Sequence, residues 1–254
     1  MGVIAVFNQK GGVGKTTTAL NLLATIARRG HRPFGIDLDP QAHLSHVFGL
    51  QPRLADDSIY SFFVRGRPLA DVAQITRSGV VVCPAHLELA KIDSLLGKGV
   101  KVVTKLRQAL HDHALPAAPV VIDCSPLLNT LSLNAIFACD VLLVPVSSDF
   151  LSLRGAQQVE RAVNALEPVF KRRLPRRYLL TRYDGRRDMS EEVVREMASA
   201  FRPEDICATR IHESVKLAES PAIELDVFRH APGSSGAQDY EALGDELMRA
   251  GFVN

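Results

Sequence analysis

A short glycine-rich run near the start of the chain constrains the fold more than any other feature. Residues 3–7 before it are apolar and mostly β-branched or aromatic, which predicts a buried strand. Residues 17–29 after it carry apolar side chains at helical spacing and are followed by Gly30, a favourable residue at a helix end. Such a turn between strand and helix predicts a βαβ unit. The run reads Lys10-Gly11-Gly12-Val13-Gly14-Lys15-Thr16-Thr17.

This run has the spacing of a phosphate-binding loop. Glycines let the backbone approach a phosphate, and the N–H groups and positive end of the following helix attract it. Lys15 would neutralise the phosphate charge, and the hydroxyl of Thr16 would bind Mg²⁺. A chance glycine-rich turn is the alternative, and both the spacing and the flanking elements count against it. We therefore predict a nucleotide site that uses ATP or ADP with Mg²⁺.

Lys10 is an additional lysine at the start of this run. Lys15 and a metal ion can already neutralise one nucleotide, and a cation at the start of the loop cannot easily curl back onto its own γ-phosphate. Reaching the nucleotide of a neighbouring copy is geometrically feasible. We therefore expect a homodimer with nucleotide sandwiched at the interface, and a solvated surface lysine is the alternative.

Two of the predicted strands end in aspartates. An apolar strand ends in Asp123, which is the Walker-B pattern that assists Mg²⁺ through water. The strand after the first helix ends near Asp37 and Asp39, at the edge of the sheet that faces the ligand crevice. Because Asp39 lies further out, we assign it to positioning the attacking water and Asp37 to the outer shell of the metal. The alternative is that both are turn residues before Pro40.

Apolar runs and helical patterns alternate along the rest of the chain. This alternation predicts an α/β fold with a doubly wound, mostly parallel sheet and helices on both faces. No linker separates two domains, so we expect a single domain, 1–254, with the irregular stretch 49–78 as a peripheral excursion. Further strands are predicted at 33–38, 80–83, 120–122, 141–146, 178–180 and near 206–211. Further helices are predicted at 87–96, 100–114, 130–138, 154–166, 190–201 and 237–250.

The composition indicates which cell compartment and which kinds of partner to expect. The net charge of this 254-residue chain is only +2, so nucleic acid would have to bind a local basic patch. No apolar run approaches the roughly 18 residues that span a bilayer. The cysteines lie far apart without a Cys-x-x-Cys pair, which predicts reduced, buried thiols and a cytoplasmic protein. They are Cys83, Cys124, Cys139 and Cys207.

The phosphate loop and the aspartates after the predicted strands resemble those of the ParA/Soj branch of the ParA/MinD family of deviant Walker-A ATPases. The resemblance implies weak ATP hydrolysis by an ATP-sandwich homodimer whose turnover a ParB-like partner stimulates. It covers essentially the whole chain. The residues that carry it are 8–18 and 37–41, followed by 123–126, 133–135, 144–146, 183–186, 217–221, 231–232 and Gly236.

The resemblance also implies roles for residues of the phosphate site. Lys10 matches the signature lysine that reaches into the partner's site, and Asp39 matches the water-positioning aspartate. Lys15 would hold β- and γ-phosphate oxygens. Thr16 would hold Mg²⁺, and Thr17 would lie at the α-phosphate.

The chain departs from the family pattern at two places. The family sequence Ile-Pro-Arg-Asn-Val-Arg corresponds to residues 211–216, where His212 and Glu213 replace the proline and one arginine. The resemblance nevertheless implies that Arg182 and His212 lie on the adenine side. Ala42 and the following histidine replace the usual Gly-Asn.

The resemblance further implies that the ATP dimer binds non-specific DNA on the nucleoid and partitions or positions a cargo. Segment 171–187 carries eight basic residues against one acid, Asp184, which suits a phosphate backbone. Arg186 and Lys216 match DNA-contacting positions and remain basic. A solvated charged surface is the alternative.

Two other functions use the same fold. A MinD-like membrane switch ends in a basic amphipathic helix, but the last predicted helix here carries four acids against Arg249. Its apolar stripe, Tyr240, Leu243 and Leu247, is expected to pack on the domain. An iron–sulfur carrier would need paired cysteines at a dimer axis, and Cys124 has no evident second thiol. Both alternatives are less favoured than DNA binding.

Overall fold

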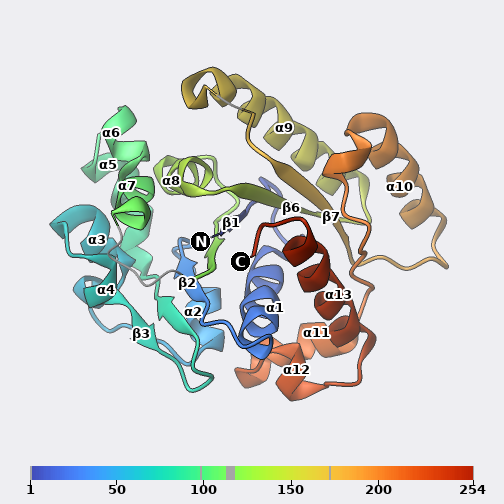
Figure 1. The fold of residues 1–254 in the computed structure, drawn as a ribbon, viewed down its shortest axis with the longest axis horizontal. Helices are drawn as coiled ribbons and strands as arrows, with labels where there is room; N and C mark the ends of the chain where they lie inside the picture. Colours follow the sequence, from blue (N-terminus) through green and yellow to red (C-terminus); the bar gives the residue numbers. More distant parts are fainter. Residues whose placement is uncertain (1, 98, 113–117, 172, 254) are drawn as a thin grey trace.

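The fold is a seven-stranded sheet with helices on both faces (Figure 1). The computed structural model describes residues 2–97, 99–112, 118–171 and 173–253. The strand order is β3-β4-β2-β5-β1-β6-β7, and every neighbouring pair is parallel except β3 and β4. This confirms the doubly wound, mostly parallel α/β class. The strands are β1 (Val3–Val6), β2 (Phe34–Asp37), β3 (Gln74–Ile75), β4 (Val81–Cys83), β5 (Val120–Asp123), β6 (Val141–Ser147) and β7 (Arg176–Thr181).

Helices connect the strands and form the two outer layers. They are α1 (Lys15–Arg28), α2 (His43–Val47), α3 (Ile59–Arg65), α4 (Leu69–Val72), α5 (Ile92–Leu95), α6 (Val100–Val103), α7 (Lys105–His111), α8 (Thr130–Ala138), α9 (Phe150–Phe170), α10 (Asp188–Ala200), α11 (Val215–Glu219), α12 (Val227–His230) and α13 (Ser235–Arg249). Short 3-10 turns are η1 (Ala55–Asp57), η2 (Leu87–Lys91), η3 (Pro203–Asp205) and η4 (Ser220–Ile223).

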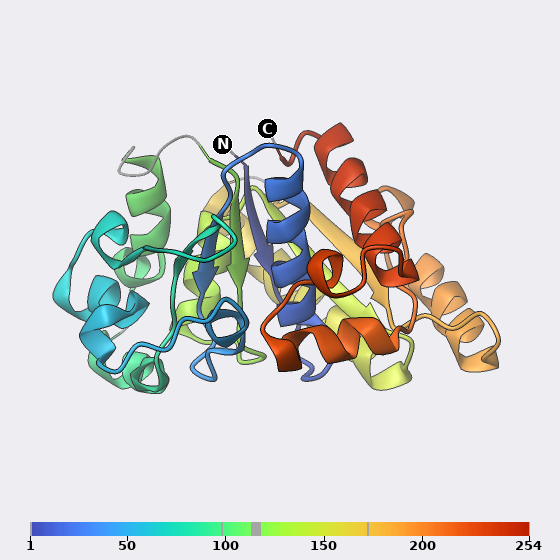
Figure 2. The same ribbon diagram turned by 90° about the horizontal axis from the view of Figure 1, so that it is seen from below.

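Alternate residues of each strand enter two separate cores, as the pleat of a sheet requires. Ile4 and Val6 of β1 pack in the core beneath α1, α2, α12 and α13, and α1 and α13 lie side by side on this face (Figure 2). Val3 and Ala5 pack in the opposite core, beneath α3, α4 and α7 to α10. The stretch 49–78, predicted to be peripheral, supplies buried residues such as Phe62 and Phe63 to this second core.

Residues 206–211 do not form the predicted strand. The segment runs beside β7, where Ile206 bridges Tyr178, and a second bridge joins His212 to Tyr183 just beyond the strand. The N–H groups of Cys207 and Ile211 donate to carbonyls of β7, at 3.0 and 2.9 Å. The backbone N–H groups at residues 208 and 209 donate instead to the carboxylate of Glu246 on α13. The pairing with β7 is therefore interrupted between Cys207 and Ile211.

The predicted helix 100–114 is divided into α6 and α7 at Thr104. The run of β-branched residues 102–104 favours this break. The side-chain amide of Asn134 on α8 satisfies the exposed backbone groups, accepting from the N–H of Leu106 at 3.0 Å and donating to the carbonyl of Val102 at 3.0 Å. The predicted end of that helix, Ala114, lies outside the described residues. Residues 87–96 likewise form η2 and the short α5 in place of one helix.

Candidate nucleotide site

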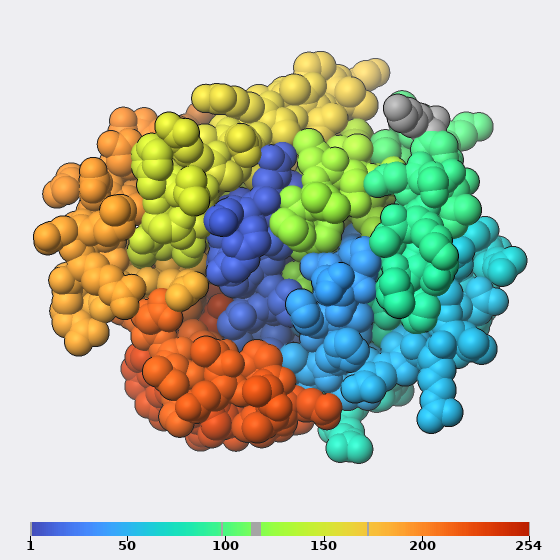
Figure 3. All heavy atoms as spheres, turned by 180° about the vertical axis from the view of Figure 1, so that it is seen from behind, coloured from blue at the N-terminus to red at the C-terminus, as the bar shows by residue number. Residues whose placement is uncertain are grey.

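Three adjacent strands bring the predicted site together at one edge of the sheet. β2, β5 and β1 are neighbours, and their carboxyl ends carry Asp37, Asp123 and the phosphate loop. Asp37 is in register with Asp123, which is in register with Val6. Figure 3 shows that the N-terminal segment, in dark blue, is exposed at the centre of the molecular surface at this edge of the sheet.

The phosphate loop bends sharply before α1. Gly12 and Gly14 have φ of 79° and 87°, a left-handed region that glycine adopts without a steric penalty. Lys15 follows at the first position of α1, is 7% exposed, and donates from Nζ to the carbonyl of Lys10 at 2.9 Å. Burial lowers the pKa of Lys15, and the charge of Asp123 opposes this effect. The loop therefore holds a buried cation beside the helix N-terminus.

Asp123 is a fully buried carboxylate, and its two oxygens accept no hydrogen bond within the described part of the chain. Burial raises its pKa well above the usual range, the charge of Asp37 raises it further, and the nearby Thr16 hydroxyl and Lys15 oppose both effects. A buried carboxylate without a partner is costly. Its hard oxygen donors beside the Thr16 hydroxyl fit Mg²⁺ with its bound water.

Asp37 is buried as well, but its oxygens accept several hydrogen bonds. Oδ2 accepts from the N–H of Ser45 at 2.9 Å and from its hydroxyl at 2.6 Å, and Oδ1 accepts from the N–H of Asp39 at 3.1 Å. Burial nevertheless raises the pKa of Asp37 to about 6. The hydroxyl of Ser45 also accepts the N–H of Ala85 after β4. Asp37 therefore anchors the segment that carries Asp39, a role that the sequence interpretation did not assign to it.

Asp39 lies two residues beyond the end of β2 at this edge of the sheet and is 8% exposed. Its Oδ1 accepts the N–H of Gln41 at 2.9 Å, which makes a tight turn after β2. Ala42 follows with φ of 55°, where the family pattern has glycine. This backbone costs an alanine about 1 kcal/mol. Burial of the methyl group of Ala42 returns about 0.8 kcal/mol, which offsets part of that cost.

A cavity of about 280 Å³ adjoins the phosphate loop. Arg182 and His212, predicted for the adenine side, both line it. Arg182 pairs with Glu213 at 3.0 Å, and Nδ1 of His212 lies 3.0 Å from a carboxylate oxygen of Asp239. The cavity is also lined by residues that sequence reasoning did not assign to the site, among them Thr181 and Tyr240.

Those two residues join the cavity to the loop and to α1. The hydroxyl of Thr181 donates to the carbonyl of Val13 at 2.9 Å, and the hydroxyl of Tyr240 lies 3.2 Å from that of Thr18. Tyr240 belongs to the apolar stripe of α13, whose burial confirms that the stripe packs on the domain. An apolar stripe gives no sign of a nearby ligand, so the sequence could not identify Tyr240 as a lining residue.

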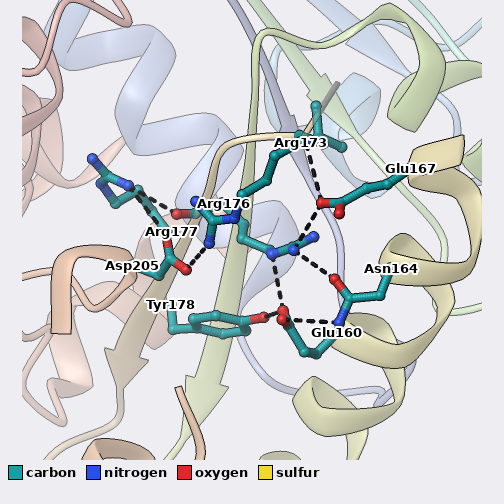
Figure 4. Close-up of polar contacts among 9 residues, drawn as sticks. Glu160, Asn164, Glu167, Arg173, Arg176, Arg177, Tyr178 and Asp205 are labelled. Atoms are coloured by element: carbon teal, nitrogen blue, oxygen red, sulfur yellow. Dashed lines mark hydrogen bonds and ion pairs between the residues drawn. The ribbon is translucent and has the colours of Figure 1, made fainter. Parts of the chain in front are cut away.

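Several arginines of the basic segment 171–187 pair with acidic residues from other parts of the chain. Arg176 is 2% exposed and pairs with Glu160 and Glu167 of α9, each at 2.9 Å (Figure 4). Asp205 of η3 similarly pairs with Arg173 and Arg177. The interpretation of this segment as one continuous patch is therefore wrong for Arg176, which is too buried to reach DNA. Arg172 lies outside the described residues.

The two predicted DNA-contacting residues are exposed, but each has an acidic partner. Arg186 is 90% exposed at its side chain and makes two hydrogen bonds to Asp184, at 2.9 and 3.0 Å. Lys216 is half exposed and lies 2.8 Å from Glu219. Exposed ion pairs of this kind are weak, so both cations remain available to a stronger anionic partner.

All four cysteines are buried. Burial raises the pKa of Cys124 well above the usual thiol value, which disfavours the thiolate that an iron–sulfur cluster needs. Within the described residues, no group of three or more His, Cys, Asp and Glu side chains is arranged to hold a metal ion. No described helix is long and apolar enough to cross a membrane.

Known proteins are similar to this chain in sequence and in fold. The family described as an AAA domain matches residues 1–175. The chain is 34% identical over 250 residues to the chromosome partitioning protein ParA of Caulobacter vibrioides, covering 97% of this chain and 93% of that protein. It is 36% identical over 252 residues to the chromosome-partitioning ATPase Soj of Thermus thermophilus, covering 96% and 94%. The structure of cobyrinic acid a,c-diamide synthase from Mycobacterium smegmatis, with bound ADP and magnesium, is 28% identical with a TM-score of 0.83, covering 98% and 94%.

Proposed function

The chain belongs to the ParA/MinD family of P-loop ATPases, and on that basis we propose that residues 1–254 act as one dimerising ATPase domain that hydrolyses ATP slowly. The observation that carries the proposal is the meeting of Lys15, Asp39 and Asp123 at one edge of the sheet, beside the exposed Lys10. The bound ADP and magnesium of the Mycobacterium smegmatis protein support ATP, ADP and Mg²⁺ as ligands.

Each residue of the loop has a part in ATP hydrolysis. The backbone N–H groups of residues 11–14 and the Lys15 ammonium hold the β- and γ-phosphates, and Thr17 lies at the α-phosphate. Asp39 orients the attacking water, since it interacts electrostatically with Lys15 and its Oδ2 makes no hydrogen bond to the described residues. The adenine ring occupies the cavity beside Arg182 and His212.

Mg²⁺ would bind the Thr16 hydroxyl directly and Asp123 through water, with Asp37 in the outer shell. The ion neutralises phosphate charge when bound. The unpartnered oxygens of Asp123 support this assignment most strongly, because a metal-bound water would satisfy them. Asp37 is the weaker candidate, since Ser45 and Asp39 already donate hydrogen bonds to it.

The active form is an ATP-sandwich homodimer in which Lys10 reaches the nucleotide of the second copy. Its side chain makes no hydrogen bond or ion pair with any described residue, so it is available to a partner. Exposed apolar side chains follow β5 and β6 at the same edge of the sheet, and such groups mark interaction surfaces. They are Leu127, Leu128, Phe150 and Leu151.

The ATP dimer binds non-specific DNA through Arg186 and Lys216, and a ParB-like protein stimulates hydrolysis and releases it. The names of the Caulobacter and Thermus relatives support chromosome partitioning as the process. The protein would then be cytoplasmic and associated with the nucleoid, where it partitions or positions DNA or a protein complex.

A MinD-like membrane switch is the less favoured alternative. The acids of α13 are engaged with the protein itself: Glu241 pairs with Arg28, and Glu246 accepts two backbone N–H groups. Because the apolar stripe of α13 is buried, this helix has no apolar face left for a lipid surface.

The substitution Asp39→Ala tests the proposal. We expect hydrolysis to fall at least a hundredfold while ATP still binds, so that the variant accumulates as an ATP-bound dimer. Phosphate release and analytical ultracentrifugation with ATP measure the two effects. Asp112→Ala, at an exposed aspartate after α7, is the matched control and should behave like wild type. Undiminished turnover in Asp39→Ala would remove Asp39 from the mechanism.

A further inference from the structure

Gly155 of α9 lies directly against the start of the phosphate loop. A Cβ atom at this position would be 2.7 Å from Oδ1 of Asn8 and 3.2 Å from Cβ of Lys10. The first distance is shorter than atoms of side chains tolerate, so any residue larger than glycine must displace Asn8, Lys10 or the helix.

Hydrogen bonds hold both loop residues in place. Asn8 is fully buried, donates from Nδ2 to the carbonyl of Pro145 at 2.7 Å, and accepts the N–H of Lys10 at Oδ1 at 3.0 Å. The carbonyl of Lys10 accepts from the ammonium of Lys15. The backbone of Lys10 is therefore fixed on both sides, while its side chain extends into solvent.

The helix α9 is also held, so it cannot easily shift to relieve an overlap at Gly155. At its start, Asp149 accepts the N–H of Ser152 at 2.9 Å. Further along, the guanidinium of Arg176 binds Glu160 and Glu167 across the gap to β7 (Figure 4). These pairs fix the position of α9 against the sheet, because a displacement would leave the buried charge of Arg176 unpaired.

We propose that Gly155 and Asn8 are positioning residues that aim Lys10 out of its own subunit. Because Gly155 has no side chain, the start of the loop can lie directly against α9. Asn8 fixes the Lys10 backbone that carries the exposed ammonium. This inference rests on the proposed function, in which Lys10 acts on the nucleotide of the second copy.

The variant Gly155→Ala tests the inference. Alanine favours a helix more than glycine does, so α9 itself is not weakened. We expect the ATP-dependent dimer, measured with a non-hydrolysed ATP analogue in analytical ultracentrifugation, to bind about tenfold more weakly. The affinity of the monomer for MgADP, measured by calorimetry, should stay within about twofold, since Lys15 remains in place. Gln158→Ala, on the exposed side of α9, is the control and should match wild type in both measurements.

Lys10→Ala and the double variant with Gly155→Ala complete the cycle. If both substitutions act through Lys10, the double variant should dimerise no more weakly than Lys10→Ala. Normal dimerisation of Gly155→Ala, with Lys10→Ala impaired, overturns this inference and leaves the proposed function standing. Normal dimerisation of Lys10→Ala overturns the role of Lys10 and the inference with it.

Asn8→Ala provides a second approach that introduces no overlap, in case Gly155→Ala fails to fold. It removes the acceptor for the N–H of Lys10 and should weaken the dimer while MgADP still binds. Equal losses of MgADP binding and dimerisation in Asn8→Ala would show a general structural role for this contact and contradict positioning of Lys10.

Discussion

Two buried aspartates stand opposite each other at the ends of β2 and β5, in different surroundings. Asp37 accepts three hydrogen bonds from protein groups, whereas the oxygens of Asp123 have none within the described residues. Burial is the largest cause of the raised pKa at both residues. The charge of Asp37 raises the pKa of Asp123 further, and the charge of Asp39 raises the pKa of Asp37. The protein therefore tolerates a costly pair of charges where a cation is expected to bind.

This pair gives the free protein an unusual pH dependence. The pKa of Asp37 is about 6 in the folded state and near 3.8 when unfolded, so the folded state binds more protons between these values. Stability contributed by Asp37 therefore falls as the pH rises from about 4 to 6, by an amount on the order of 3 kcal/mol. In Asp37→Asn this loss should disappear. The free energy of unfolding of the wild type should therefore fall relative to that of the variant across this pH range. Urea unfolding at several pH values, without nucleotide, measures the difference.

Asp184 supplies the control for this experiment. Hydrogen bonds from Arg186 hold its pKa at about 2, so its contribution is complete above about pH 4 and is lost only below that. The difference between wild type and Asp184→Asn should therefore be flat from pH 4 to 6. A slope in Asp184→Asn equal to that in Asp37→Asn would refute the assignment to buried Asp37.

Some residues of the site could be predicted from sequence and others could not. Lys15 and Asp123 could be predicted from local patterns. A glycine-rich turn places Lys15 at the start of a helix, and an apolar strand places Asp123 at its carboxyl end. Asn8 and Gly155 touch only after the chain has formed α9, and they are 147 residues apart in sequence. No local pattern marks such a contact.

At the scale of helices and strands, apolar patterns predicted β1, β2 and β4 to β7, since these buried strands are nearly all apolar. The patterns were wrong where distant side chains replaced backbone partners. Asn134 bonds to the backbone on both sides of the break between α6 and α7. Glu246 accepts the N–H groups of residues 208 and 209, where the pairing with β7 is interrupted. Arg176 is a further case, because the acids that neutralise it lie on a separate helix.

The contact between α1 and α13 gives a prediction about packing. A Cβ atom at Gly244 would lie 2.4 Å from Cγ2 of Thr25, so Gly244→Ala should destabilise the protein by about 1–3 kcal/mol. Thr25→Ser removes that methyl group but keeps the hydroxyl that donates to the carbonyl of Asn21. The double variant should recover most of the loss in chemical denaturation. Failure of Thr25→Ser to rescue Gly244→Ala would mean that α13 clashes elsewhere.

Across the whole molecule, ion pairs decide which basic residues can meet DNA. Arg176 is buried between two acids and cannot leave them without a large penalty. Arg186 is almost fully exposed, so its pair with Asp184 is worth little and can be exchanged for a phosphate. The net charge of +2 gives no general attraction, so any binding to DNA must come from a local group of exposed cations such as Arg186 and Lys216.

Arg186→Glu combined with Lys216→Glu should therefore abolish retention on DNA in the ATP state while nucleotide affinity is unchanged. The slope of the logarithm of the binding constant against the logarithm of the salt concentration should decrease in magnitude by about 0.9 for each phosphate contact that is lost. Binding to a non-specific duplex at several salt concentrations measures both quantities. Arg53→Glu with Lys101→Glu changes the net charge equally at exposed residues. The helix α6, which carries Lys101, and the helix α10 lie at opposite ends of the molecule (Figure 1). If this control pair loses DNA to the same extent, overall charge and not the Arg186 surface determines binding.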